Sequence, residues 1–117
     1  MGQFFWPVGV LSADGERMET VDAMVDTGAS YSMFPQSMLE RLGIEKRFLL
    51  PFEQAEGSVI DRDVGQAVLV INDTDSSMRV IFGPEGSDPL IGSNALQEFL
   101  LLIDPVGEQL VSRTGRL

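Results

Sequence analysis

The sequence contains neither cysteine nor histidine. Without cysteine there is no disulfide framework, no thiolate nucleophile and no cysteine-based metal site. Without histidine, Ser-His and Cys-His catalysis are excluded, and the commonest zinc ligand is missing. Any acid–base chemistry must therefore use carboxylates, lysine or tyrosine.

Positive charge is also scarce, with 8 basic against 18 acidic residues and a net charge of -10. This surplus opposes phosphate backbones and anionic lipid surfaces, so neither nucleic acid nor a membrane is expected as a partner.

Membrane-spanning and targeting segments are not apparent in the sequence. No apolar run is as long as the roughly 18 residues that a membrane-spanning helix needs. The amino terminus lacks the basic region and the apolar core of a signal peptide. The composition predicts a cytoplasmic protein.

Short β-prone stretches dominate a chain whose length, 117 residues, suits one domain spanning residues 1–117. Hairpins are predicted where two such stretches flank a turn: residues 8–25, 48–60, 66–82 and 100–111. The second hairpin has its tip near Gly57, and the turn of the third spans residues 72–77. The pattern predicts a mostly antiparallel β domain.

Two short helices are predicted between the strands. Residues 35–42 place three apolar side chains on one helical face, and Gly43 follows as the terminating residue. Residues 93–99 form the second helix, with Ser93 as its N-cap. The acidic segment 73–78 begins like a calcium loop, but Met78 occupies the position that needs glycine, so no metal site is predicted.

The segment Val-Asp-Thr-Gly-Ala-Ser at residues 25–30 occurs once. An Asp-Thr-Gly turn behind an apolar strand is how aspartic peptidases present a water-activating carboxylate, and that chemistry needs two carboxylates. With one copy per chain, the second Asp would come from another chain. Asp, Thr and Gly are also common turn formers, so an ordinary turn is the alternative interpretation.

Together with Leu-Ile-Gly-Ser-Asn-Ala-Leu at 90–96 and Leu-Leu-Ile-Asp-Pro-Val-Gly at 101–107, this segment resembles the retropepsin-like aspartic peptidases. The likeness runs from about residue 8 to residue 111 and is nearer to the cellular and prokaryotic members than to retroviral proteases. It implies a mostly β fold, a retropepsin-like closed β-barrel (acid protease fold) with short helices and one lobe per chain.

The resemblance also implies roles for individual residues. Asp26, Thr27 and Gly28 would form the catalytic motif, with Thr27 bonding to the partner's loop and Gly28 allowing close backbone approach. Gly92 would let a strand cross tightly behind Asp26. The implied substrate-binding residues are Ala29, Ser30, Gly57, Ile60 and Leu90.

Two of these positions carry alternatives. Ser30 matches the cellular members, whereas retroviral enzymes often place an Asp there that binds the substrate backbone. Gly57 is either the tip of a flap that closes over substrate or an ordinary hairpin glycine. Apolar subsites are expected from four side chains: Val25, Ile60, Phe82 and Leu90.

The sequence thus predicts an aspartic endopeptidase that acts as a homodimer on peptide or protein substrates and uses no cofactor. One alternative is a dimeric protein-binding module that kept the fold without useful turnover. Another is an acidic β domain in which Asp26 only shapes a turn. The intact Asp-Thr-Gly favours the enzyme.

Overall fold

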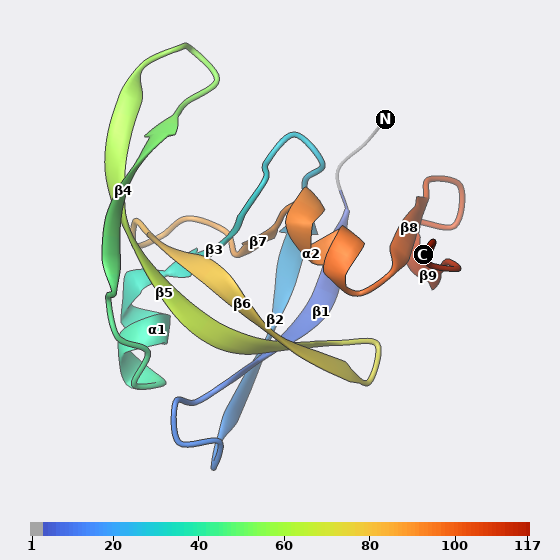
Figure 1. The fold of residues 1–117 in the computed structure, drawn as a ribbon, viewed down its shortest axis with the longest axis horizontal. Coiled ribbons are helices and arrows are strands. Elements are labelled where there is room, and N and C mark those ends of the chain that lie inside the picture. The colour runs from blue at the N-terminus through green and yellow to red at the C-terminus, as the bar shows by residue number, and fades with distance from the viewer. Residues whose placement is uncertain (1–3) are drawn as a thin grey trace.

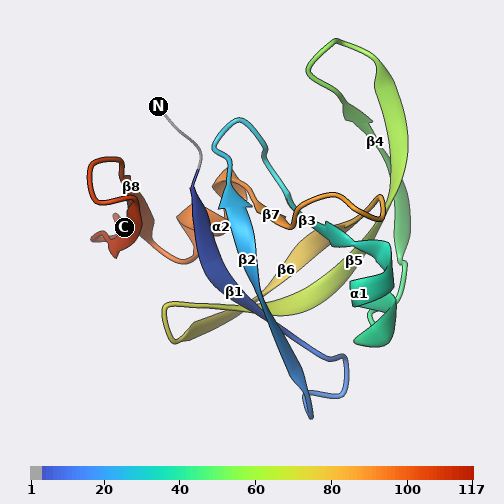
Figure 2. The ribbon, with the colours of Figure 1, turned by 180° about the vertical axis from the view of Figure 1, so that it is seen from behind.

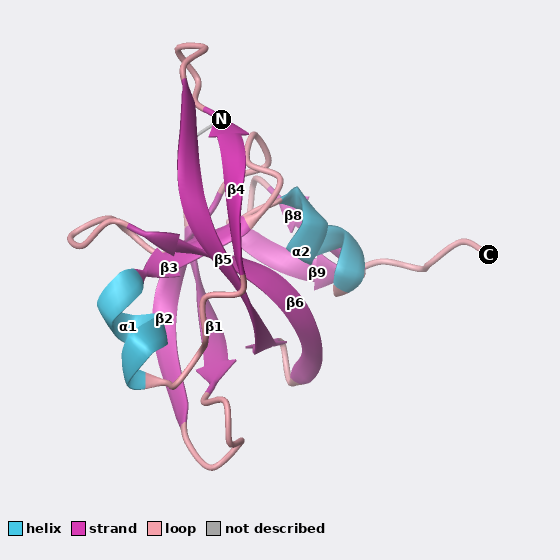
Figure 3. Cartoon of the chain, turned by 60° about the vertical axis from the view of Figure 1, so that its left-hand side comes forward, coloured by secondary structure: helices cyan, strands magenta, loops and turns pink. Residues whose placement is uncertain are grey.

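The structure is a computed structural model that describes residues 4–117. Its strands are β1 (Phe5–Leu11), β2 (Met18–Val25), β3 (Ser32–Pro35), β4 (Phe48–Glu53), β5 (Val59–Ile71), β6 (Thr74–Gly83), β7 (Leu90–Ile91), β8 (Leu101–Asp104) and β9 (Gln109–Ser112). The helices are α1 (Gln36–Arg41) and α2 (Ser93–Glu98). Figure 3 shows the two helices on different sides of the strands.

The strands close into a barrel. The sheet runs in the order β1-β2-β7-β3-β6-β5-β4, and β5 also pairs with β1, so the pairings form a closed circuit with β4 attached outside it (Figures 1 and 2). Most pairs are antiparallel, whereas β2–β7 and β3–β6 are parallel. The mostly β, retropepsin-like fold predicted from sequence is confirmed. Strands β8 and β9 form a separate hairpin.

Strand β5 corrects one expectation about the hairpins. Residues 58–60 and 66–71 were expected in separate strands, but β5 is continuous over Val59–Ile71. Its first half pairs with β4 and its second half with β6. The charged residues between them stay in the strand because side chains alternate across it, so polar groups remain accessible on one face. The hairpin β4–β5 therefore projects from the barrel as a continuation of a barrel strand (Figure 1).

The turn between β5 and β6 is shorter than predicted. Asn72 and Asp73 have φ values of 51° and 63°, so these two residues alone form the turn. Asn and Asp adopt this left-handed region more readily than other non-glycine residues. Thr74 consequently pairs with Ile71, and the polar segment expected to be a loop is strand.

The apolar stretches meet in one buried cluster inside the barrel and beneath the helices. Its fully buried large members include Val8, Val10, Phe34, Leu39, Leu42, Leu69, Ile71, Val80 and Ile91. Helix α1 ends as predicted: the backbone N–H of Gly43 donates to Glu40, and that of Ile44 donates to Leu39. No helix between residues 4 and 117 has the length and apolar character of a membrane span.

Candidate active site

The loop after β2 holds Asp26 through backbone bonds. The backbone N–H of Asp26 donates to the carbonyl of Ile91 at 3.1 Å, next to the parallel pairing of β2 with β7. The Asp26 Oδ1 accepts the backbone N–H of Gly28 at 2.9 Å, and the Asp26 carbonyl accepts the N–H of Ala29 at 3.2 Å. Both the backbone and the carboxylate of this half-buried residue are therefore oriented.

Strand β7 and helix α2 cross directly behind this loop. The N–H groups of Ser93 and Asn94 donate to the carbonyls of Ala29 and Ser30 at 2.8 and 3.0 Å. A Cβ on Gly92 would lie 2.7 to 2.8 Å from backbone atoms of the loop, so only glycine fits here without moving the backbone.

The crossing also corrects the predicted cap of α2. Gly92 is the N-cap residue, and no side-chain bond caps the helix. Ser93 is the first helical residue and gives its N–H to the loop. The first N–H groups of a helix need partners from outside the helix, and here the Asp26 loop provides two of them.

A groove of about 480 Å³ runs between the loop and the outer part of the β4–β5 hairpin, next to its tip. Its lining residues are Gly28, Ala29, Ser30, Tyr31, Met33, Phe52, Glu53, Gln54, Ile60, Arg62, Ile81, Pro84 and Leu90. The rings of Tyr31 and Phe52 meet edge to face, with centroids 5.7 Å apart and an interplanar angle of 78°. This contact joins the loop to the hairpin across the groove.

Four of the five predicted substrate-binding residues line this groove: Ala29, Ser30, Ile60 and Leu90. Gly57 does not. It lies at the hairpin tip with a φ of 97°, and a Cβ built on it meets no atom within 4 Å. Its role as a flap tip stays a prediction, as do the binding roles of the other four.

The prediction of apolar subsites was wrong for Val25 and Phe82. Both belong to the buried core and are absent from the groove lining, because their strands turn these side chains into the barrel. Tyr31, Phe52 and Arg62 also line the groove and were not predicted from the sequence. For the last two a signal existed, since alternation along a hairpin puts Phe52 and Arg62 on the same face as Ile60.

A family model described as gag-polyprotein putative aspartyl protease matches residues 15–98. The chain belongs to this family. The match includes the Asp26 loop, the β4–β5 hairpin and all of α2, and it confirms the retropepsin-like resemblance. No curated protein matches the chain.

Three solved structures of proteases share the fold of this chain. A retropepsin-like aspartic protease from Rickettsia conorii has 20% identity and a TM-score of 0.63, covering 93% of this chain and 80% of that one. EIAV protease complexed with the inhibitor HBY-793 has 17% identity and a TM-score of 0.59, covering 94% and 93%. The simian foamy virus (mac) protease has 15% identity and a TM-score of 0.55, covering 79% and 90%. Among these three, the Rickettsia protein has the highest identity and TM-score, which fits the predicted prokaryotic leaning.

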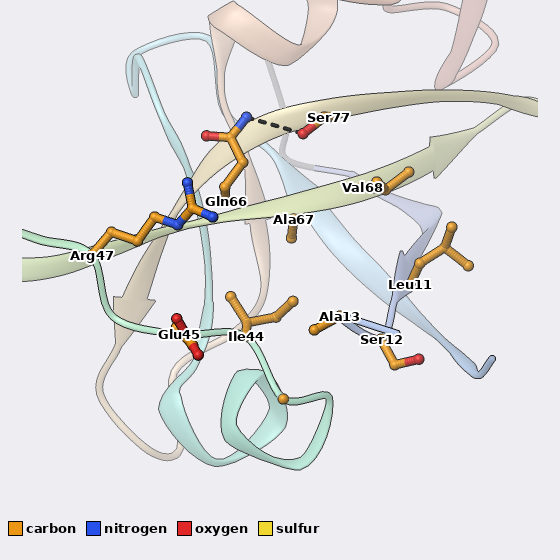
Figure 4. Close-up of a pocket in the computed structure, with 11 residues that line it drawn as sticks. Leu11, Ser12, Ala13, Ile44, Glu45, Arg47, Gln66, Ala67, Val68 and Ser77 are labelled. Carbon is orange, nitrogen blue, oxygen red and sulfur yellow. Dashed lines mark hydrogen bonds between the residues drawn. The ribbon is translucent and has the colours of Figure 1, made fainter. Parts of the chain in front are cut away.

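The family member has a second cavity, of about 350 Å³, that includes no residue of the Asp26 loop (Figure 4). Its wall carries Arg47, Gln66 and Ser77, and the Gln66 amide donates to the Ser77 hydroxyl at 3.0 Å. Across the cavity lie Ala13 and Ile44 (Figure 4). The described part of the chain places no three His, Cys, Asp or Glu side chains where they could hold a metal ion. The groove beside Asp26 is therefore the candidate active site.

One wall of the groove depends on a charged contact. Pro84 lines the groove, and the carboxylate of the next residue, Glu85, accepts the backbone N–H of Ser37 at 2.7 Å at the start of α1. The Ser37 hydroxyl donates to the same carboxylate. These hydrogen bonds lower the pKa of Glu85. The ionised carboxylate thereby fastens the loop after β6 to the helix.

Proposed function

We propose that the chain is an aspartic endopeptidase that works as a homodimer, with one Asp26 from each chain activating a water molecule for peptide-bond hydrolysis. The observation that carries this proposal is the oriented carboxylate of Asp26 on a loop that borders a groove of about 480 Å³. The groove has an apolar wall on the hairpin side, from Phe52 and Ile60, which suits peptide side chains. Family membership supports the same activity.

The need for a second chain follows from a count of carboxylates. Among the described residues that line the groove, Glu53 is the one acidic side chain, and it lies on the hairpin. A symmetric dimer brings a second Asp26 to the first by applying one two-fold rotation. The exposure of Thr27 and Gly28 in the single chain supports a partner that covers the loop.

The chemistry of such a pair follows from electrostatics. Two carboxylates a few ångströms apart cannot both ionise cheaply, so they share one proton. The ionised group takes a proton from the water, whose oxygen attacks the scissile carbonyl, while the protonated group polarises that carbonyl. The bond from the Gly28 N–H would hold one carboxylate oxygen in place during this exchange. The mechanism uses no metal or cofactor.

Replacing Asp26 by Asn tests the proposal. The amide oxygen still accepts the Gly28 N–H, so the loop should keep its shape, while cleavage should fall by about 10³-fold because the proton exchange is lost. Digestion of a peptide library at several pH values measures this, with a maximum expected on the acid side of neutrality. Unchanged cleavage by Asp26→Asn would assign the activity to another site. A folded wild type without cleavage would favour the binding-module alternative.

Subunit mixing separates a shared site from a self-contained one. When wild type is mixed with an equal amount of Asp26→Asn and the subunits exchange fully, about a quarter of the dimers keep both Asp26 residues. Activity should fall to roughly half that of the same amount of wild type alone, provided that mixed dimers are inactive. A site made within one chain from Asp26 and Glu53 would lose nothing on mixing, and Glu53→Gln would then abolish cleavage.

The terminal hairpin offers apolar surface for the second chain. Leu102 and Val111 are neighbours across β8 and β9, and they are 51% and 37% exposed. We expect Leu102→Lys to weaken the dimer about tenfold or more, because a charge would replace buried apolar area. Leu49→Lys is the matched control, since Leu49 is 64% exposed on the projecting hairpin. Sedimentation across a concentration series measures both. Equal effects would place the interface elsewhere.

A further inference from the structure

The projecting hairpin presents a mixed face to the groove. Leu50 lies opposite Arg62 in the β4–β5 register, and Phe52 lies opposite Ile60. These four side chains share one face because alternate residues of a strand point the same way. Phe52, Ile60 and Arg62 all line the groove. An otherwise apolar wall therefore carries one cation.

Among the described residues 4–117, this cation has no ion-pair partner. The sequence neighbours Asp61 and Asp63 point to the opposite face of β5, and the Asp63 carboxylate lies 3.6 Å from the Lys46 ammonium. The ion pairs formed within residues 4–117 involve Lys46 and Arg41, not Arg62. Arg62 is nevertheless half-buried. A partly desolvated guanidinium without a carboxylate is poised to accept one from a ligand.

The other charged residue of the groove does not occupy the same place. Glu53 is exposed, and alternation puts it on the face of β4 opposite to Phe52. It forms no ion pair with Arg62 within 4.0 Å. The cation and the anion of the groove therefore act on different parts of a bound chain.

The overall charge of the protein acts differently from this contact. A net charge of -10 repels every acidic peptide during approach, and salt screens that repulsion over about 8–10 Å. Discrimination between Glu and Gln at one bound position depends instead on the contact inside the groove. Arg62 therefore favours an acidic side chain in the groove, although the net charge of the protein repels acidic peptides.

We infer that Arg62 is a specificity-determining residue that selects peptides with a Glu or Asp side chain bound against the β4–β5 hairpin. The inference rests on the proposed peptidase function and names its substrate class. In a symmetric dimer each chain contributes one Arg62, so the preference arises once on each side of the scissile bond.

Paired pools of short synthetic peptides test the preference. The two pools are identical except that one position, varied in turn, carries Glu in one pool and Gln in the other. For wild type, kcat/KM should be about five- to tenfold higher with Glu at the preferred position, as expected for one partly desolvated ion pair. Arg62→Gln should bring this ratio near one, Arg62→Glu should invert it, and Arg62→Lys should keep part of it.

Arg47 is the matched control. It lies on the wall of the second cavity and is exposed, so Arg47→Gln and Arg47→Glu change the net charge equally without touching the groove. Both should keep the wild-type ratio. Wild-type cleavage with a ratio of one at every position, or equal losses for the Arg47 and Arg62 variants, overturns the role of Arg62 while the peptidase stands.

A binding measurement separates this inference from the proposed function. If wild type cleaves no peptide, the peptidase proposal fails, and fluorescent versions of the Glu and Gln peptides then report on the groove directly by anisotropy. Several-fold tighter binding of the Glu peptide, lost in Arg62→Gln and kept in Arg47→Gln, supports Arg62 as the selecting residue. Equal binding of the two peptides, or no binding of either, overturns it.

Discussion

The Asp26 loop and the tip of the β4–β5 hairpin are held in opposite ways. The loop is bonded to β7 and α2, which come from a distant part of the chain. The residues of the tip, 54–58, are all exposed, and the backbone bonds of the tip stay within the hairpin. Figure 1 shows the hairpin extending away from the barrel. Chemistry needs fixed geometry, whereas substrate entry needs an element that opens at little cost.

The largest expected effect is a loss of stability when Gly92 is replaced by alanine, and the same replacement at Gly57 is its comparison. Gly92→Ala puts a Cβ within 2.8 Å of the loop backbone, so it should lower the free energy of unfolding by about 3 kcal/mol or more and abolish cleavage. Gly57→Ala meets no atom and should cost only about 1 kcal/mol, from its positive φ. Urea unfolding of both variants measures the contrast. A Gly57 variant that fails to fold would make the tip structural and move the flap elsewhere.

A smaller effect is expected at the contact that joins the two regions. Tyr31 and Phe52 meet edge to face, so a double-mutant cycle with alanine at both positions should give a coupling energy of about 0.5–1.5 kcal/mol. Phe48 is the control on the same strand: it is 47% exposed and lies against Arg79 instead of the loop. Coupling between Phe48 and Tyr31 should be near zero. Equal coupling in both cycles would show that the contact does not tie hairpin to loop.

The smallest expected effect concerns pH. Hydrogen bonds from Ser37 hold the pKa of Glu85 below its usual 4.5, so the stability it contributes is full above about pH 4.5 and is lost as pH falls through the folded-state value. Glu85→Gln should therefore lower the urea midpoint at pH 7 and change it least near pH 3. Glu40→Gln, on the exposed side of α1, is the control. A constant difference across pH would remove the charged contact as its cause.

The same contrast explains what the sequence could predict. The Asp26 turn, the crossing at Gly92 and the hairpin around Gly57 each have a local chemical signature, and the structure has all three. The groove has no such signature. Tyr31 and Arg62 both line it because β5 continues from the barrel into the hairpin, and no short segment of the sequence specifies such long-range pairing.

The cap of α2 failed for a related reason. Ser93 has a side chain that could cap the helix. The backbone N–H groups at the helix start bond instead to the carbonyls of Ala29 and Ser30, and Gly92 is the N-cap residue. The hydrogen bonds between α2 and the Asp26 loop thus override the preference of serine for the N-cap position. The placement of Asp26 and its neighbours could thus be anticipated, whereas their catalytic and binding roles await the experiments above.

The bond from Asp26 to Ile91 also has a consequence for timing during synthesis. At about 5–20 residues per second, roughly 3–13 s pass on the ribosome between the two residues. Throughout that interval the nascent chain carries the Asp-Thr-Gly segment without the strand that orders it. A truncated product ending before Ile91 likewise lacks the backing for its loop. The chain order thus delays the backbone bond that orders Asp26 until Ile91 has been made.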